Sequence, residues 1–392
     1  MTKPVYLDYA ATTPVDADVA RIMNACLTDD DAFGNSSSGQ HAFGREAGKR
    51  IEWAREQVAK LIGATAEDVI WTSCATEADN LAIVGAAQFR AASGRHIITA
   101  ASEHPAVLDA CQHLDQQGFE VTILPADARG IIDPGRVAGT LTDATTLVSI
   151  MHVNNEIGVV QDIGAIGAIC RAHGALFHVD AAQSACHLPI DVVSQSIDML
   201  SLSAQKMYGP KGVGALYLNR ERVRRLEPLM FGGSQEGGLR PGTVPTHQVV
   251  GMGEACRIVL TDMQAGSKRI TALRDRLWAG IGDIPGVLLN GDSEQRVCHI
   301  LNVSVTGVEG ESLHFGLRDL AVSAGSACTT LDAAPSAVLR GLGRSDQLAR
   351  ASVRFSFGRP TTEAEIDFAS ETFRNVVAKL RGIAPTSAQA NV

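Results

Sequence analysis

A lysine and an aspartate each follow an apolar run, and together they could hold a planar cofactor that carries an aldehyde. Asp180 ends the run 176–179, and Lys206 comes three residues after the run 199–203. An amine can hold the aldehyde of pyridoxal 5′-phosphate (PLP) as a Schiff base, and a carboxylate can keep its pyridine nitrogen protonated. The pair therefore predicts a PLP site, for which Lys211 in a Gly–Pro turn is the competing lysine.

Each of these residues also has an ordinary structural interpretation. Lys206 alone could be a surface lysine, and Asp180 could be the N-cap of the next helical segment. Gln183 could donate to the ring hydroxyl of the cofactor, or it could complete a capping box with Asp180. Their occurrence together favours the cofactor interpretation.

The segment 72–77 could bind a phosphate group. Backbone N–H groups at a helix start, joined by hydroxyls, form an anion site, and Ala75 and Thr76 lie where a strand is followed by a helix. Ser203 could add another hydroxyl. The alternative is an ordinary capped turn between a strand and a helix.

Three more residues could act on a substrate. His104, just before a proline, could stack on a flat ring and move protons, although a capping or core histidine is the more common interpretation. Arg354 could bind a carboxylate through two hydrogen bonds, or could instead form a structural ion pair. Cys328 lies among small residues, in a segment with little to bury, which suits a cysteine that must enter and leave a site.

The bulk composition excludes several classes of protein. A net charge of -9 disfavours nucleic-acid binding as the main function. The start has no signal peptide pattern, and no apolar run approaches the ~20 residues of a membrane span. We therefore expect a soluble cytoplasmic protein. The eight cysteines show no spacing typical of metal ligands, so we expect reduced thiols and no metal site.

Alternating apolar runs and amphipathic stretches must position these residues. This pattern between about residues 69 and 217 predicts an α/β fold with a mostly parallel sheet covered by helices. Ligands of such sheets bind beyond the carboxyl ends of the strands. We expect strands at 69–73, 96–100, 120–124, 146–153, 176–180, 199–203 and 214–218, and helices at 77–90, 106–117 and 163–173.

The pattern changes after Pro245, where helices are expected at 248–263 and 267–281. An α+β pattern follows from about residue 287. The sequence thus predicts a large PLP-binding domain, residues 16–262, and a small domain, residues 1–15 plus 263–392, that carries Cys328.

Several motifs in order resemble the class I (NifS/IscS-like) cysteine desulfurases, within the class V aminotransferase group of fold-type-I PLP enzymes. The resemblance extends from Tyr6 to about Arg381. Its motifs include Tyr6–Pro14, Ala75–Glu77, His152–Glu156, His178–Gln183, Gly325–Thr329 and Arg354–Ser356.

The resemblance implies an activity that converts L-cysteine to L-alanine. Sulfur would be held as a persulfide on Cys328 and passed to an acceptor protein, either a scaffold or a sulfurtransferase. The same resemblance assigns Lys206 to the Schiff base, Asp180 to the pyridinium and Gln183 to the ring hydroxyl, with His104 stacked on the ring and taking part in proton transfer.

Further roles follow from the resemblance alone. Asn35 and Arg354 would bind the substrate carboxylate. Thr243 would reach the phosphate of a neighbouring subunit, which implies a homodimer. The remaining cofactor contacts would come from Ala75, Thr76, Asn155, Ser203 and Gln205.

Some positions depart from the family pattern. Gln205 stands where the family usually has histidine before the lysine, and Gln235 also replaces a common histidine. A specialised sulfur pathway is therefore a hypothesis; iron–sulfur cluster assembly, tRNA thiolation and DNA phosphorothioation are among the destinations. Alternatives are a selenocysteine or cystine lyase, an aminotransferase-like enzyme in which Cys328 is incidental, and a scaffold of a sulfur-relay complex.

Overall fold

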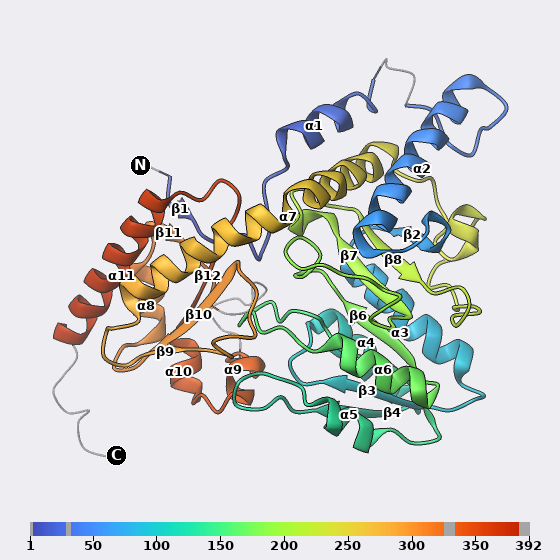
Figure 1. Ribbon diagram of the computed structural model, residues 1–392. Coiled ribbons are helices and arrows are strands. Elements are labelled where there is room, and N and C mark those ends of the chain that lie inside the picture. Colours follow the sequence, from blue (N-terminus) through green and yellow to red (C-terminus); the bar gives the residue numbers. More distant parts are fainter. Residues whose placement is uncertain (1–2, 29–32, 325–333, 384–392) are drawn as a thin grey trace.

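The computed structural model describes residues 3–28, 33–324 and 334–383, and its larger part is built on a central β-sheet (Figure 1). The strand order is β2-β8-β7-β6-β5-β3-β4. Neighbouring strands from β7 to β4 are parallel, whereas β8 is antiparallel to both β2 and β7. The strands are β2 (Val69–Thr72), β3 (His96–Ala100), β4 (Glu120–Leu124), β5 (Thr145–Ser149), β6 (Leu176–Asp180), β7 (Met199–Ser203) and β8 (Gly214–Leu218).

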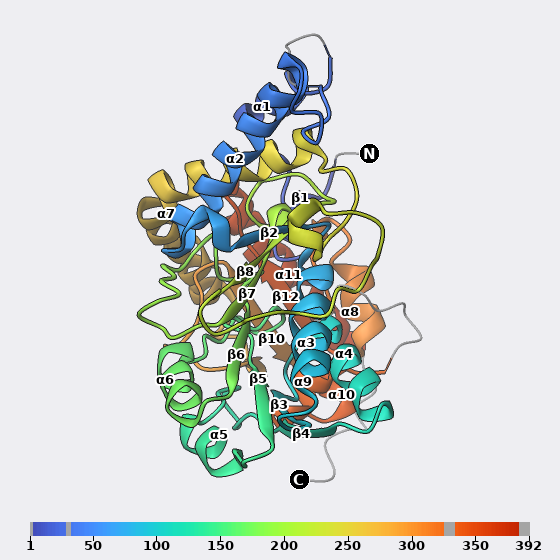
Figure 2. The same ribbon diagram turned by 90° about the vertical axis from the view of Figure 1, so that its right-hand side faces the viewer.

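Helices cover both faces of this sheet, as Figure 2 shows with α3 and α4 on one side and α6 on the other. Successive strand residues point to opposite faces, so Ile97 packs in the core with α3 and α4, while Ile98 joins the core with α2 and α6. This double burial explains the continuous apolar runs. The α/β prediction is confirmed, with α2 (Ala42–Ile62), α3 (Ala75–Arg90), α4 (Pro105–Gln116), α5 (Pro134–Thr140) and α6 (Ile163–His173).

The smaller part has its own hydrophobic core under an antiparallel sheet of order β12-β10-β9. The start of the chain joins it, because β1 pairs in parallel with β11. Its elements are β1 (Val5–Tyr6), β9 (Val287–Leu289), β10 (Ile300–Val305), β11 (Leu320–Ala321), β12 (Ser352–Ser356), α8 (Gly310–Gly316), α9 (Ala337–Gly341), α10 (Asp346–Arg350) and α11 (Glu363–Ile383).

One long helix, α7 (Thr246–Ile281), runs from one core to the other (Figure 1). Val259 packs in the first core and Ile270 in the second. The predicted break near residue 265 was wrong: the helix continues through Gly266, whose cost of about 1 kcal/mol is small beside the burial at both ends. The proposed domain boundary at residue 262 falls inside this helix.

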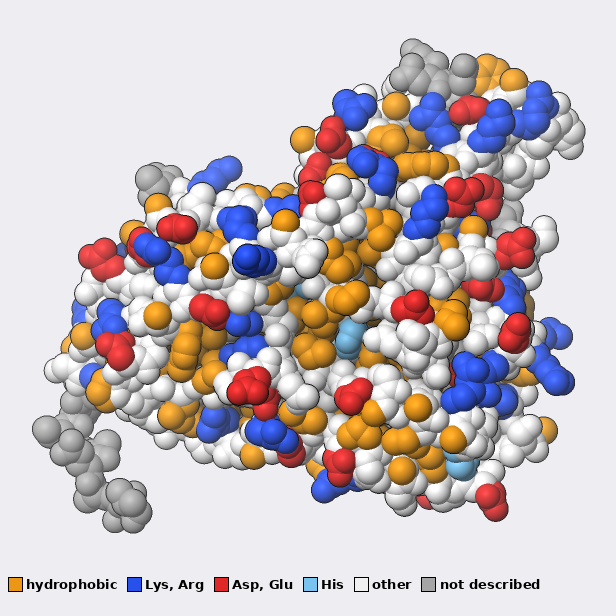
Figure 3. All heavy atoms as spheres, in the orientation of Figure 1, with side chains coloured by type: hydrophobic (Ala, Val, Ile, Leu, Met, Phe, Trp, Pro, Cys, Tyr) orange, Lys and Arg blue, Asp and Glu red, His pale blue; other side chains and the backbone are white. Residues whose placement is uncertain are grey.

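The described helices also include α1 (Ala17–Asn24), which packs on α7. None of the helices formed by the described residues is long and apolar enough to cross a bilayer. On the face shown in Figure 3, acidic and basic side chains are interspersed rather than gathered by sign.

Candidate active site

A cavity of about 700 Å³ lies at the carboxyl ends of the parallel strands, and it gathers most of the predicted site residues. A volume of this size is typical of a site for a small molecule. The predicted residues that line it are Ala75, Thr76, His104, Asn155, Asp180, Gln183, Ser203, Gln205, Lys206 and Arg354.

Lys206 enters the cavity from the 3₁₀ turn Ala204–Lys206 that follows β7. Its Nζ donates to the carbonyl oxygens of Ala10 and Ala11, at 2.7 and 2.5 Å. Lys211 is exposed and is not among the lining residues. The geometry therefore favours Lys206 over its competitor as the amine of the site.

Asp180 ends β6 as a buried carboxylate with a cationic neighbourhood. Its Oδ1 accepts from the backbone N of Ala182 at 2.8 Å. Burial raises the pKa of Asp180, whereas the backbone hydrogen bond and the electrostatic influence of His104 and Lys206 lower it. Because an ionised carboxylate is costly inside a protein unless it is paired, this position fits the protonated ring nitrogen of PLP.

The pyridine side of the site rests on a buried polar layer that sequence reasoning missed. His178 lies between the hydroxyls of Ser149 and Ser201, at 2.8 and 3.0 Å. Burial lowers the pKa of His178 to about 3. Burial also raises the pKa of Asp79 well above its usual value. The only sequence signal was an acid inside the apolar pattern of a helix.

The phosphate end is formed where β2 passes into α3. Cys74 is the N-cap, so Ala75 and Thr76 begin the helix with backbone N–H groups that have no acceptor within it. Gly214 on β8 allows the close approach, since a Cβ there would lie 2.7 Å from the carbonyl carbon of Cys74. Ser203, which is buried, supplies a hydroxyl to the same cavity. The donor set fits a phosphate group.

His104 is the N-cap of α4 and borders the cavity. Its Nδ1 accepts from the backbone N of Ala106 at 3.1 Å, so the neutral ring carries its proton on Nε2. Burial lowers the pKa of His104, and the charge of Asp180 opposes that shift. A neutral imidazole with a fixed tautomer suits proton transfer at the site.

Gln183 is held from both ends of its amide. Its Nε2 donates to the carbonyl of Ala10 at 2.8 Å, and its Oε1 faces Nε2 of His299 at 3.1 Å. One amide hydrogen remains for the cavity, because the NH₂ group has two donors. That hydrogen fits the predicted contact with the ring hydroxyl.

Arg354, which is almost fully buried, forms the other end of the cavity. Its Nη1 donates to the carbonyl of Asn155 at 2.7 Å, and its Nη2 donates to Oδ1 of Asp8 at 2.9 Å. Ser323 also donates to this Asp8 oxygen, at 2.9 Å. Arg354 therefore forms the structural ion pair that was the alternative interpretation, with Asp8 as its partner. The binding of a substrate carboxylate by Arg354 stays a prediction.

Cys328 lies outside the described residues, but residues 334–338 after it line the cavity, and Ser323 before it contacts the lining residue Arg354. Ser323 forms two backbone hydrogen bonds with Arg354, at 2.8 and 3.3 Å. On the other side, Ser336 donates to Oε2 of Glu156 at 2.5 Å, and both residues line the cavity. No sequence pattern indicated this contact between Glu156 and Ser336.

Two predicted residues are not brought to the cavity within one chain. Asn35 is exposed, and its side chain accepts from the backbone N of Ser37 in a local turn. The structure thus does not place Asn35 beside Arg354. Thr243 is also exposed and away from the lining residues. A role for Thr243 in a neighbouring subunit stays a prediction.

Comparisons with known proteins agree with this geometry. A sequence profile of the aminotransferase class-V family matches residues 5–368. The chain is 55% identical over 385 residues to the cysteine desulfurase IscS of Pectobacterium atrosepticum, which covers 98% of this chain and 95% of that protein. The chain belongs to the class V aminotransferases and, among them, to the cysteine desulfurases.

Solved structures give the same result for the fold. SspA in complex with cysteine superposes with a TM-score of 0.81 and 38% identity, covering 91% of this chain and 99% of that one. DndA from Streptomyces lividans has a TM-score of 0.76 and 40% identity, covering 90% and 99%. This desulfurase depends on PLP, and the buried acid, lysine and phosphate cradle described above fit that cofactor.

Proposed function

We propose that this cysteine desulfurase converts L-cysteine to L-alanine and holds the released sulfur on Cys328. The observation that carries the proposal is the convergence of Lys206, Asp180 and Arg354 on one cavity, which residues 334–338, just after the Cys328 segment, also line. PLP, when bound, supplies an electron sink for the bonds that break at the substrate carbon.

The residues of the chain would divide the remaining work between them. Arg354 would hold the substrate carboxylate through charge-assisted hydrogen bonds. His104 and Lys206 would move protons to and from the substrate, since a neutral imidazole and an amine lie on the same cavity. The Cys328 thiolate would form an S–S bond with the substrate sulfur as its C–S bond breaks, and the carbon would then take up a proton.

The decisive experiment compares Cys328→Ala with Cys26→Ala. Cys26 is a buried thiol that does not line the cavity. With L-cysteine, PLP and a thiol reductant, we expect Cys328→Ala to lose both alanine and sulfide, whereas Cys26→Ala keeps both. Alanine and sulfide formed at the normal rate by Cys328→Ala would show that another route breaks the C–S bond.

We also propose that the site is completed in a homodimer. Thr243 is exposed, and the segment that leads to it carries the exposed apolar side chains of Leu229, Met230 and Phe231, the last 86% exposed. Exposed apolar clusters of this kind are typical of protein interfaces. Sedimentation of the holoenzyme should give the mass of two chains, and a Phe231→Glu variant should shift it toward one chain.

Sulfur on Cys328 would then pass to an acceptor protein in the cytoplasm. A persulfide transfers its outer sulfur to another thiolate by the same displacement that exchanges disulfides. The enzyme loaded with ³⁵S from labelled L-cysteine should transfer label to an acceptor thiol, and Cys328→Ala should not. Equal labelling of an acceptor by both forms would contradict the relay.

A further inference from the structure

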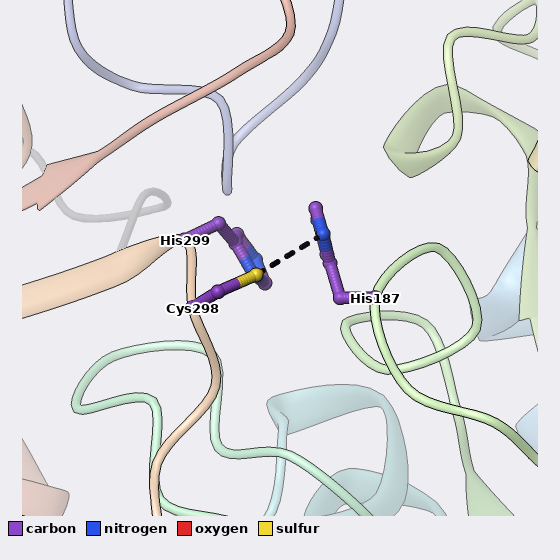
Figure 4. Close-up of side chains that lie close together, drawn as sticks. All are labelled: His187, Cys298 and His299. Atoms are coloured by element: carbon purple, nitrogen blue, oxygen red, sulfur yellow. Dashed lines mark hydrogen bonds between the residues drawn. The ribbon is translucent and has the colours of Figure 1, made fainter. Parts of the chain in front are cut away.

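One cluster of titratable side chains outside the cofactor cavity joins the two cores. His187 approaches from the turns after β6, whereas Cys298 and His299 lie just before β10 (Figure 4). The two imidazole rings stack, with their centroids 3.9 Å apart and their planes 20° apart. The lone pairs of imidazole lie in the plane of each ring, so those of the two stacked rings do not converge on one ion. A second group of side chains, beside the phosphate end of the cavity, is arranged differently.

A carboxylate in this second group lies beside the turn that forms the phosphate cradle. Glu77 is the third residue of α3, whose first two residues, Ala75 and Thr76, present free N–H groups to the cavity. Its Oε2 accepts from the backbone N of Ser73 at 2.7 Å, so the side chain turns back across the start of the helix. Glu77 does not itself line the cavity. The chain therefore places a negative charge close to the position expected for another anion.

This carboxylate opposes the binding of a phosphate group unless its charge is balanced. A phosphate monoester carries a charge of about -1.5 to -2 near pH 7, and like charges repel strongly where water screens them poorly. The basic side chains among the described residues that line the cavity are His104, Lys206 and Arg354. Lys206 is assigned to the aldehyde, and Arg354 lies at the other end of the cavity. The balancing charge must therefore come from outside the cavity.

Arg240 supplies this charge. Its Nε donates to Oε1 of Glu77 at 3.0 Å, although the two residues are 163 positions apart in the chain. The side chain of Arg240 is 21% exposed and that of Glu77 is 14% exposed, so both are shielded from most of the solvent. With the carboxylate neutralised, the positive end of the α3 dipole determines the potential at the cradle.

The segment that carries Arg240 is held against the sheet by other contacts. Glu236 forms an ion pair with Arg55 at 2.8 Å, and it also accepts from a backbone N–H of β2 at 2.9 Å. The side chain of Gln235 accepts from the backbone N of Gly242 at 3.1 Å, which closes the segment around Arg240. Since Arg55 already balances the charge of Glu236, these contacts leave Arg240 as the partner of the carboxylate beside the cradle.

We propose that Arg240 is a positioning residue for the cofactor phosphate, which acts by neutralising Glu77 at the start of α3. The inference rests on PLP binding in the cavity of the proposed function. It concerns non-covalent binding alone, so no bond forms or breaks. Pyridoxal, which lacks the phosphate, should therefore not respond to the charges of this pair.

The test measures the dissociation constants of PLP and pyridoxal for the full-length apoenzyme. Arg240→Gln leaves the charge of Glu77 unbalanced, so PLP binding should weaken at least about 10-fold. Glu77→Gln keeps an acceptor for the Ser73 N–H and leaves the charge of Arg240, so PLP should bind at least as tightly as to the parent. The double variant removes both charges, and its PLP affinity should return to within about 3-fold of the parent.

Two further comparisons separate charge from structure. The dissociation constant of pyridoxal should be the same in all three variants, and added chloride salt should reduce the loss of PLP affinity in Arg240→Gln. Arg276→Gln is the matched control, because Arg276 pairs with Asp367 in the smaller part of the molecule, outside the cavity. This control should leave both dissociation constants unchanged. Urea unfolding confirms that each apoenzyme is folded.

Three results would overturn the proposal. Weaker PLP binding by Glu77→Gln, or no recovery in the double variant, would show that the pair supports the turn rather than balances a charge. Equal losses for PLP and pyridoxal in Arg240→Gln would place the effect away from the phosphate. These outcomes leave the proposed desulfurase function intact. A parent chain that does not bind PLP would refute the cofactor site itself, and this proposal with it.

Discussion

The two ends of the active-site cavity are built in different ways. The cofactor end takes Asp180, Ser203 and Lys206 from the carboxyl ends of adjacent parallel strands of one sheet. The substrate end instead combines Asp8, Ser323 and Arg354, which come from three distant parts of the chain and meet at the smaller core. The first end depends on one sheet, whereas the second depends on how separate segments dock.

This difference indicates which end can change without loss of the fold. Residues at strand ends are fixed by the sheet itself, because its ladder sets where each strand stops. The Arg354 guanidinium is fixed by Asp8, Asn155 and Ser323, so a change in any of these alters its position. We therefore expect substrate binding to be more sensitive than cofactor binding to changes in the smaller part.

The largest effect should come from the cofactor end. Lys206→Ala removes the amine of the site, and alanine formation from L-cysteine should fall by about 10³-fold or more. Lys211→Ala is the matched control, because Lys211 is exposed and lies outside the cavity. Comparable losses in the two variants would contradict the assignment of Lys206.

A smaller effect should separate binding from chemistry at the substrate end. Arg354→Lys loses the planar, two-pronged donor, so KM for L-cysteine should rise by about 10- to 100-fold. KM for L-cysteine methyl ester, which lacks the carboxylate, should rise much less. Arg257→Lys is the control, because Arg257 is an exposed arginine that pairs with Glu254 outside the cavity. Equal increases for acid and ester would show that Arg354 acts only through the ion pair with Asp8.

The smallest effect concerns the buried polar layer below the cofactor end, which contains His178. Since burial lowers the pKa of His178 to about 3, the folded protein keeps this ring neutral while the unfolded chain takes up a proton below about pH 6.5. Stability therefore falls as pH drops from about 6.5 toward 3. His178→Asn should reduce this slope.

Urea unfolding of PLP-saturated protein at pH 7, 6 and 5 measures the slope of the unfolding free energy with pH. Replacement of the exposed His113 by glutamine serves as the control. An unchanged slope in His178→Asn would show that acid destabilisation comes from other groups. Comparing the slopes of the variant and the parent, rather than their unfolding free energies at pH 7, removes any loss of stability that does not depend on pH.

The sequence was sufficient to predict the sheet and the meeting of Asp180 and Lys206 at one cavity. The bounds predicted for β3, β4, β6, β7 and β8 agree with the structure residue by residue. Continuous apolar runs mark strands buried on both faces, and the polar residue after each run then belongs to the cavity. Asp180 and Lys206 were predictable for this reason.

The contacts that depend on docking were not predictable from local pattern. The pairing of Arg354 with Asp8 spans 346 residues, and each residue alone has several ordinary interpretations. The same holds for His187 and Cys298, whose contact forms only when the two cores are placed side by side. The break predicted near Gly266 was wrong because the low helix propensity of one glycine costs less than the burial of Val259 and Ile270 contributes.

The course of α7 also restricts how the chain can vary over evolution. Between Val259 and Ile270 this described stretch has no buried residue. Its side chains are therefore less restricted than those at its ends, although Met263 packs on the first core and Ser267 and Arg269 donate to backbone carbonyls. The length of this stretch cannot change in the same way, because each inserted or deleted residue turns one end of a helix by about 100° relative to the other. A single deletion there would rotate the substrate end of the cavity away from the cofactor end. The length of this stretch is therefore more restricted than its sequence.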